Sequence, residues 1–158
     1  MIYVIHVQSG SEDDVCTALR RAGIEGSSPK HELLERRKGS WHTVCRTIFP
    51  GYVFLISEHM NDEIYYTVRQ TNGVVRFLGR PPVPLSVSEA ARISWILEAG
   101  ILTVSEGYED SNGLHITKGI LKGREKQIVK YSRRRKRCTL YCEINRRRLY
   151  YDISAEIK

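Results

Sequence analysis

The chain contains no long hydrophobic run. Among its 158 residues, no apolar stretch approaches the roughly 20 residues that a membrane-spanning helix needs. The opening MIYVIHVQSG holds a short apolar segment but no basic leader before it, so it does not predict a secretory signal peptide. We therefore expect a cytoplasmic protein with no membrane partner.

Cysteine is also scarce, with four residues in the chain. The cytoplasm keeps such thiols reduced. Cys138 and Cys142 have a C-x3-C spacing on a predicted strand, whereas Cys16 and Cys45 lie far away in the chain. A structural zinc site needs about four ligands, so we expect no metal site.

No catalytic motif is present. The segment GILKG, residues 119–123, lacks the spacing and the Lys-Ser/Thr pair of a phosphate-binding loop, and there is no His-Glu-x-x-His sequence or nucleophile elbow. The five histidines are scattered, and His6 and His115 fall within predicted strands. We expect no enzyme activity, no catalytic residues and no cofactor.

What is abundant is positive charge, and it is distributed unevenly. Residues 108–158 hold 14 Lys/Arg and 6 Asp/Glu, a net +8, while the remainder holds 11 (25 − 14) and 12 (18 − 6), a net −1. Five consecutive cations, residues 133–137, stand in KYSRRRKRCTL, and three more in NRRRLYY. Clustered cations on a small domain are typical of nucleic-acid binding, and a merely solvated basic face is the alternative.

The first part of the chain alternates strand and helix patterns. Ser11 is the expected N-cap of a first helix, because an acidic first turn and apolar residues at helical spacing follow it. Asn61 is the expected N-cap of a second helix for the same reasons. Ser86 and Glu89 form a capping-box pair at the start of a third helix, whose apolar face holds Ile93, Ile96 and Leu97. The predicted order is β-α-β-β-β-α-β-α: strand 2–7, helix 11–22, strands 30–39, 42–49 and 51–57, helix 60–72, strand 74–79, a proline loop 80–85 and helix 86–99.

The second part has a different pattern. Four short strand-like runs, residues 114–117, 125–131, 137–144 and 149–157, are separated by Gly-rich or Arg-rich turns. Such a pattern predicts a small β-barrel. We therefore expect an α+β fold: an antiparallel sheet flanked by helices over residues 1–100, a linker over 101–107, and a small all-β barrel over 108–158.

The segment FPGYVFL combines a tight turn with a strand. Pro50 fixes φ and Gly51 permits a backbone conformation closed to other residues. Alternation then places Tyr52, Phe54 and Ile56 on one face of the strand. That aromatic face is either core or a partly open surface that receives a partner, and the residues alone favour core.

These segments carry a resemblance. IYVIHVQSGSEDDV, RTIFPGYVFLIS and VRQTNGVVRFLGRPPVPLS resemble the N-terminal domain of the NusG family of transcription elongation factors, and ITKGILKGREKQIVKYSRRRKR resembles the KOW motif of its C-terminal barrel. The resemblance implies a first domain that docks on the clamp of RNA polymerase through Tyr52 and Phe54. It also implies contact with the opposite jaw through a loop after the second helix, at Thr67, Val68 and Arg69. Two positions depart from the family pattern: Ile2-Tyr3 replaces the usual tryptophan, and Glu125-Lys126 replaces a Glu-Gly pair.

Within the family, the basic barrel most resembles that of LoaP-type antiterminators, which bind hairpin RNA. The implied RNA-binding residues are Lys118, Lys122, Arg124, Lys126, Lys130, Arg133, Arg134, Arg135, Lys136, Arg137, Arg146, Arg147 and Arg148. Tyr131, Tyr141, Tyr150 and Tyr151 are candidates to stack on bases, although about half should face the core.

The sequence thus predicts a processive antitermination factor whose partners are RNA polymerase and nascent RNA, with DNA as a further candidate. We expect a monomer associated with the nucleoid through the polymerase. The alternatives are a general NusG-type factor or a DNA-recruited RfaH-type factor, each with a protein-binding barrel, and a ribosome-associated KOW protein. Val, Ile, Tyr and Thr dominate the barrel strands, which favours a permanent barrel over one that refolds to helices.

Overall fold

The computed structural model describes residues 1–158 and divides into two compact units. The first unit comprises Met1–Ser28, Phe49–Glu98 and Glu143–Arg147. The second comprises Pro29–Ile48, Ala99–Cys142 and Arg148–Lys158. No helix in either unit has both the length and the apolar character needed to cross a membrane. The domain limits expected from sequence remain a prediction.

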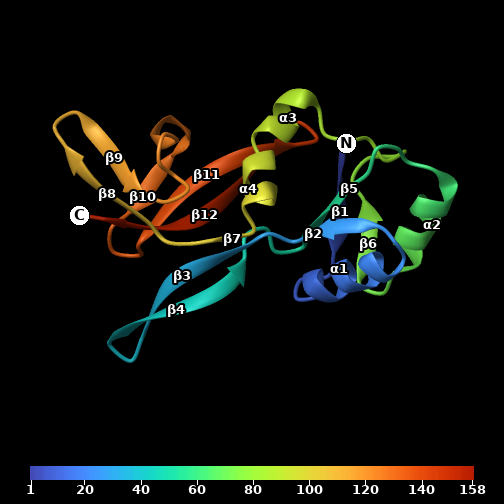
Figure 1. Cartoon of the computed structure of the whole chain (residues 1–158), viewed down its shortest axis with the longest axis horizontal. Coiled ribbons are helices and arrows are strands. Elements are labelled where there is room, and N and C mark those ends of the chain that lie inside the picture. The colour runs from blue at the N-terminus through green and yellow to red at the C-terminus, as the bar shows by residue number, and fades with distance from the viewer. The chain divides into compact units, whose positions relative to one another are not determined.

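The first unit is built on a four-stranded antiparallel sheet (Figure 1). Its strand order is β2-β5-β1-β6, with β1 at Ile2–Val7, β2 at Glu25–Ser27, β5 at Tyr52–Ile56 and β6 at Val74–Phe77. In the central pair, Ile5 lies opposite Val53 and Tyr3 opposite Leu55. The antiparallel sheet with helices confirms the expected fold class of this part.

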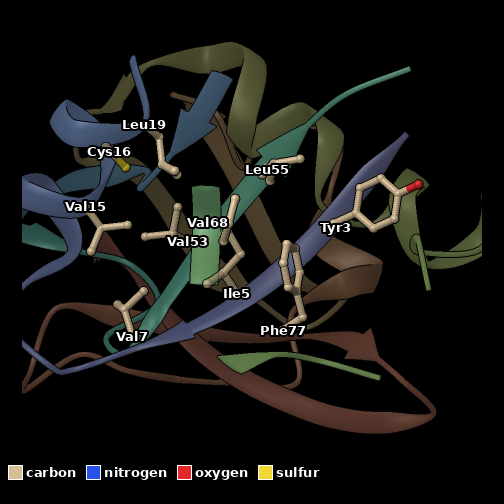
Figure 2. Close-up of a cluster of buried hydrophobic side chains, with 10 residues drawn as sticks. All are labelled: Tyr3, Ile5, Val7, Val15, Cys16, Leu19, Val53, Leu55, Val68 and Phe77. Atoms are coloured by element: carbon tan, nitrogen blue, oxygen red, sulfur yellow. The ribbon is translucent and has the colours of Figure 1, made fainter. Parts of the chain in front are cut away.

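Helices α1 (Glu12–Arg21) and α2 (Asp62–Gln70) pack against one face of this sheet, and Figure 2 shows the side chains of the core cluster that they form with it. Their apolar residues recur at helical spacing and meet the alternate residues of the strands, as periods of 3.6 and 2 require. The resulting core cluster consists of Tyr3, Ile5, Val7, Val15, Cys16, Leu19, Val53, Leu55, Val68 and Phe77.

The start of α1 differs from the prediction. Ser11 occupies the N-cap position, but its side chain makes no capping hydrogen bond. Instead, the buried carboxylate of Glu12 accepts hydrogen bonds from the backbone N–H of Gly10 at 2.9 Å and of Gly51 at 3.2 Å. A carboxylate is a stronger acceptor than a hydroxyl, so Glu12 ties the helix start to the Pro-Gly turn before β5. Gly51 adopts a φ of +87°, as the sequence predicted for this turn.

The second and third helices follow their cap signals only in part. The Asn61 side chain accepts from the N–H of Ile64 at 2.8 Å, and Ser86 and Glu89 form the predicted capping box. However, the expected third helix is broken into α3 (Val87–Ala91) and α4 (Ser94–Ala99). At the break, the Ser94 hydroxyl donates to the carbonyl of Ala90, and a side-chain donor of this kind competes with the backbone ladder of the helix.

The second unit contains a three-stranded sheet of order β4-β3-β7. Strands β3 (Lys30–Arg37) and β4 (Ser40–Thr47) form the predicted hairpin, and β7 (Ile101–Leu102) pairs with β3 in parallel. The two turn residues, Lys38 and Gly39, have φ values of 50° and 82°. Positive φ at both central residues is the pattern of a type I′ turn, whose twist matches that of the hairpin.

The same unit contains most of a five-stranded sheet of order β10-β11-β12-β8-β9. The strands are β8 (Ser105–Asp110), β9 (Gly113–Lys118), β10 (Lys130–Ser132), β11 (Arg137–Ile144) and β12 (Arg147–Ile157), and the 3-10 turn η1 (Glu125–Gln127) precedes β10. This sheet-rich part confirms the predicted all-β class. Residues 101–107, expected to be a linker, contain β7 and the start of β8.

Close backbone packing explains a glycine at the end of β9. Gly119 has a φ of +102°, and a Cβ there would lie 2.7 Å from the Cα of Ser105. No other residue fits without moving the backbone. The Ser105 hydroxyl, in turn, accepts from the N–H of Leu121 at 3.4 Å, which holds the loop after β9 against β8.

Buried polar groups in the second unit affect its stability toward acid. His31 on β3 is 4% exposed. Burial, together with the charge of Arg137 and against that of Asp152, lowers the pKa of His31 from 6.5 to about 4. As the pH falls, His31 is therefore protonated in the unfolded chain before it is protonated in the folded chain. The stability that comes from keeping His31 neutral is complete above pH 6.5 and is lost as the pH falls toward 4.

We expect the free energy of unfolding to fall by as much as about 3 kcal/mol over this window because of His31 alone, since each pKa unit corresponds to about 1.4 kcal/mol. The variant His31→Gln cannot take up this proton, so its stability should change less with pH. Urea unfolding of both proteins between pH 7 and pH 4 measures the difference. Equal pH dependence of the two proteins would show that His31 is not the responsible group.

Candidate nucleic-acid interface

The five consecutive cations predicted to bind RNA lie where the sequence placed them. Residues 133–136, here called the arginine turn, connect β10 to β11, and Arg137 is the first residue of β11. Arg133, Arg134 and Arg135 are exposed. The N–H of Arg135 donates to the Ser132 hydroxyl at 3.1 Å, which fixes the backbone of the turn. The turn thus presents several cations on a constrained loop.

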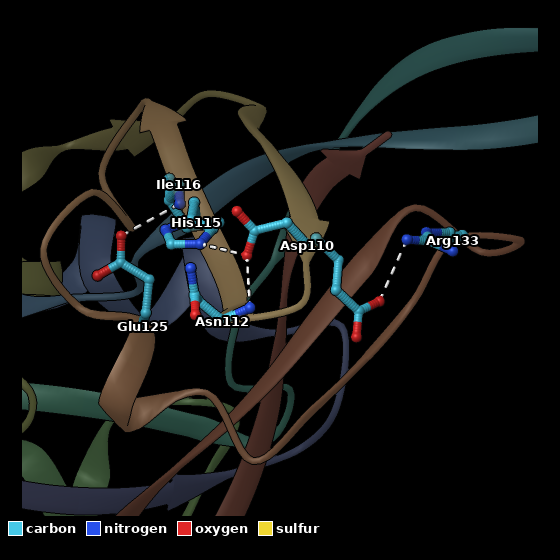
Figure 3. A network of polar contacts seen from close by, with 7 residues as sticks. Asp110, Asn112, His115, Ile116, Glu125 and Arg133 are labelled. Atoms are coloured by element: carbon cyan, nitrogen blue, oxygen red, sulfur yellow. Dashed lines mark hydrogen bonds and ion pairs between the residues drawn. The ribbon is translucent and has the colours of Figure 1, made fainter.

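Acidic side chains hold some of these cations in place. Arg133 pairs with Glu109 at 3.1 Å (Figure 3), Arg135 lies 3.9 Å from Asp152, and the Lys136 ammonium donates to Glu156 at 2.8 Å. The hydrogen bond and the charge of Lys136 lower the pKa of Glu156, which keeps this carboxylate ionised. Exposed pairs like the first two contribute little to stability.

A groove of about 490 Å³ lies beside the arginine turn. Part of its lining comes from the predicted RNA-binding set, namely Arg134, Arg135 and Arg137. The other part comes from the β3–β4 hairpin: Leu34, Glu35, Arg36, Arg37 and Trp41. The hairpin residues were not predicted from the sequence, because they lie far from the arginine turn in the chain. The one sequence feature that could have indicated them is ERRKGSW, residues 35–41, where cations stand next to a tryptophan.

The remaining predicted cations of the second unit lie outside the lining of this groove. Lys118, Lys122, Lys126 and Lys130 are exposed, and Arg124 is half-buried at the N-cap of η1. Glu125, next to Lys126, accepts from the N–H of Ile116 at 3.1 Å (Figure 3). Hydrogen bonds from the backbone N–H groups of Glu125, Ile116 and Gly123 lower the pKa of Glu125 and keep it ionised. The loop therefore carries its own internal negative charge.

The second arginine run is placed differently from the prediction. Only Arg146 lies in the turn, with a φ of 66°, after Asn145 with a φ of 54°. Arg147 and Arg148 are the first residues of β12 rather than turn residues, because a two-residue turn suffices to reverse the chain here. The Arg148 guanidinium lies 4.6 Å from the centroid of the Tyr141 ring.

Four tyrosines were candidates for base stacking. Tyr151 is 5% exposed and belongs to the core, Tyr150 is 53% exposed, and Tyr131 and Tyr141 are intermediate. The rings of Tyr141 and Tyr150 lie 6.0 Å apart. Alternation along β12 thus puts one of its two adjacent tyrosines in the core and leaves the other available.

The residues expected to meet a polymerase lie in the first unit. Phe54 is completely buried and packs edge-on against Phe49, with ring centroids 5.3 Å apart. Tyr52 is half-buried, and its ring lies 5.9 Å from that of His6. Of the two predicted side chains, only Tyr52 has a surface for a partner, while Phe54 supports the strand from within.

The expected contact loop after the second helix is part of that helix. Thr67, Val68 and Arg69 lie within α2, and Val68 belongs to the core. The helix runs to Gln70, and the Thr71 hydroxyl at its end donates to the Thr67 carbonyl at 2.8 Å. Arg69 is exposed and donates to the hydroxyl of Tyr65 at 2.9 Å.

The cysteines of β11 are packing residues. Cys138 and Cys142 share the buried face of the strand, as their spacing predicted, and neither forms a disulfide. Burial raises the pKa of Cys138 to about 11, so its thiol remains neutral. No group of three or more His, Cys, Asp or Glu side chains is arranged to hold a metal ion.

Comparisons with known proteins identify the family of this chain. The family described as "Transcription termination factor nusG" matches residues 2–94. The chain belongs to the NusG family. Among curated NusG-family relatives, the "Transcription termination/antitermination protein NusG" of Halalkalibacterium halodurans is 35% identical over 106 residues, which cover 58% of this chain and 58% of the relative.

The protein of the same name from Bacillus subtilis is 33% identical over 105 residues, covering 58% of this chain and 59% of the relative. The matched region thus spans less than two thirds of these NusG proteins. A solved structure described as "Domain interaction in Thermotoga maritima NusG" has a TM-score of 0.48 and 18% identity, covering 97% of this chain and 92% of the other.

Proposed function

We propose that this NusG-family protein is a processive antitermination factor of the LoaP type. Its first unit would bind the clamp of RNA polymerase, and its second unit would bind nascent hairpin RNA. The main support for RNA binding is the arginine turn, where Arg133, Arg134 and Arg135 are exposed on a constrained loop.

Charge supports this proposal over a protein-binding barrel. The 51 residues from 108 to 158 carry a net charge of +8, from 14 Lys/Arg and 6 Asp/Glu. Neutralising phosphates releases condensed counterions and provides much of the affinity for nucleic acid. Arginine also matches the geometry of phosphate with two parallel hydrogen bonds.

No covalent chemistry is needed for the proposed function. Binding energy would favour the closed clamp over the paused form of the polymerase, which is a shift between two states. Because one chain carries both contacts, binding of either unit raises the effective concentration of the other at its target. The factor would therefore remain on a transcribing complex once RNA has recruited it.

Transcription by a purified bacterial RNA polymerase tests the proposal. The template should carry the leader of the operon that encodes this chain, followed by an intrinsic terminator. We expect the chain to increase readthrough, and we expect the increase to disappear when the leader is replaced by an unrelated sequence. The fraction of full-length transcript measures the effect.

The alternatives give different results in this assay. A general NusG-type factor would act equally on both templates. An RfaH-type factor would depend on the displaced DNA strand, so its effect would survive removal of the emerged transcript by ribonuclease. No change in readthrough on either template would contradict an antitermination role, and co-purification with ribosomal subunits instead of polymerase would favour the ribosome-associated alternative.

A further inference from the structure

We propose that the β3–β4 hairpin and the arginine turn form one composite RNA site, in which an unpaired base stacks on Trp41 and its flanking phosphates bind the surrounding arginines. The inference rests on the proposed RNA-binding function and specifies its ligand as RNA with a bulged or looped-out nucleotide. The main observation behind this proposal is that both segments line one groove within the second unit.

The hairpin geometry brings the required groups together. Arg36 lies directly opposite Trp41 in the β3–β4 register, and Arg37 lies opposite Ser40. The type I′ turn fixes this register, since a two-residue loop sets which residues face each other. An aromatic ring and adjacent guanidinium groups are therefore held at the end of one hairpin.

Trp41 is held from one side by the arginine turn. The Lys136 ammonium lies 4.6 Å from the centroid of the indole ring, a cation–π contact. Glu156 accepts a hydrogen bond from Lys136 at 2.8 Å and so fixes the ammonium. Trp41 nevertheless remains 38% exposed and borders the groove. The ring is thus positioned in advance and retains surface on which a base can stack.

The charges of the groove suit phosphate. Its lining contains five arginines and one glutamate, a net charge of +4 (5 − 1). That glutamate, Glu35, is already paired with Arg37 at 3.1 Å and with Arg46 at 3.4 Å. The hydrogen bond from Arg37 lowers the pKa of Glu35, so the pair stays ionised. Arg36 and Arg134 have no such acidic partner and are available for a ligand.

The combination favours RNA with an unpaired base over a fully paired duplex or an acidic peptide. Regular RNA duplexes expose shape and backbone, whereas unpaired bases can leave the helix and stack on aromatic rings. Aromatic stacking plus a cationic groove is the general arrangement of proteins that bind single strands. A peptide of Asp and Glu would use the arginines but has no aromatic ring to stack on Trp41.

Two RNA probes test the inference with the full chain. One is a short RNA duplex with a single bulged adenosine, and the other is the same duplex without the bulge. By fluorescence anisotropy, we expect Trp41→Ala to weaken binding of the bulged RNA by roughly 5- to 150-fold, the range for losing one stacked base, and to change binding of the paired RNA much less. Trp41→Phe should restore most of the preference.

A matched control and a direct readout complete the design. Tyr66, on α2 in the first unit, is 59% exposed, and Tyr66→Ala should leave both affinities unchanged. The chain has two tryptophans, so a Trp95→Phe background makes Trp41 the only indole. Stacking should then quench its fluorescence with the bulged RNA and not with the paired RNA.

The outcomes distinguish this inference from the proposed function. If the unaltered chain binds RNA, but Trp41→Ala binds both probes as the unaltered chain does, the composite site is wrong and the proposed function stands. Equal weakening of both probes would contradict base stacking at Trp41. If the unaltered chain binds neither these probes nor its leader RNA, both proposals are overturned.

Discussion

Replacing Arg133, Arg134 and Arg135 with glutamine should reduce the salt dependence of RNA binding by about 2 to 3 units in the slope of log affinity against log salt. Each lost phosphate contact removes about 0.7 to 0.9 units, and these three side chains are exposed on one turn. Anisotropy titrations of a labelled hairpin RNA, repeated from low to physiological salt, measure the slope.

The control for this variant is a set of three exposed cations in the first unit. Arg20 and Arg21 in the last turn of α1, with Arg80 in the proline loop, provide the same change in net charge. Their replacement by glutamine should leave the slope nearly unchanged. If both triple variants lower the slope equally, only net charge matters, and the arginine turn is not the contact.

Phe54→Ala should lower stability more than Tyr52→Ala does, whereas Tyr52→Ala should weaken polymerase binding more. Phe54 is completely buried against Phe49, so its truncation should lower the free energy of unfolding by about 3 to 5 kcal/mol. Tyr52 is half-buried beside His6, and its truncation should lower it by only about 1 kcal/mol. Urea unfolding monitored by circular dichroism measures both.

Binding to purified RNA polymerase should show the reverse order. We expect Tyr52→Ala to weaken binding at least about 30-fold, the effect of removing an aromatic interface anchor of about 2 kcal/mol. Tyr52→Phe keeps the ring and should bind nearly normally. Normal binding by Tyr52→Ala would remove this strand from the polymerase interface.

Much of the fold could be predicted from local patterns. Strands β1 and β5 have apolar residues on both faces and end at glycine or polar turns, and α2 has its cap residue, acidic start and apolar face in the expected places. The β3–β4 hairpin was marked by the two strand patterns on either side of Gly39. In each case the local preference agrees with the tertiary environment, which is why the pattern sufficed.

The errors occurred where tertiary contacts override local preference. β2 has the sequence EGS, with no apolar residue, and exists because it pairs with β5. β8 has the acidic sequence SEGYED, which is typical of a loop, but it pairs with both β9 and β12. The Ser11 side chain makes no capping bond, and the neighbouring Glu12 carboxylate binds the N–H groups of Gly10 and Gly51 instead of those of the helix.

The candidate site was predictable only in its linear part. The arginine turn is visible as a charge run, and its position between two strands follows from the strand patterns on either side. The groove could not be predicted, because it requires knowing that the β3–β4 hairpin reaches the arginine turn within one unit. Likewise, burial of Phe54 depends on the placement of Phe49, which alternation along one strand does not reveal.

Crosslinking in a transcribing complex tests the central claim most directly. A stalled elongation complex carrying a leader transcript labelled with 4-thiouridine is mixed with the full chain and irradiated, and the crosslinked peptides are identified by mass spectrometry. The account predicts crosslinks in the peptides that contain the arginine turn and Trp41, and predicts that they are lost when the three turn arginines are replaced by glutamine. A control sample contains RNA of unrelated sequence and no polymerase. Crosslinks confined to the first unit, or crosslinking no stronger than in this control, would contradict the account.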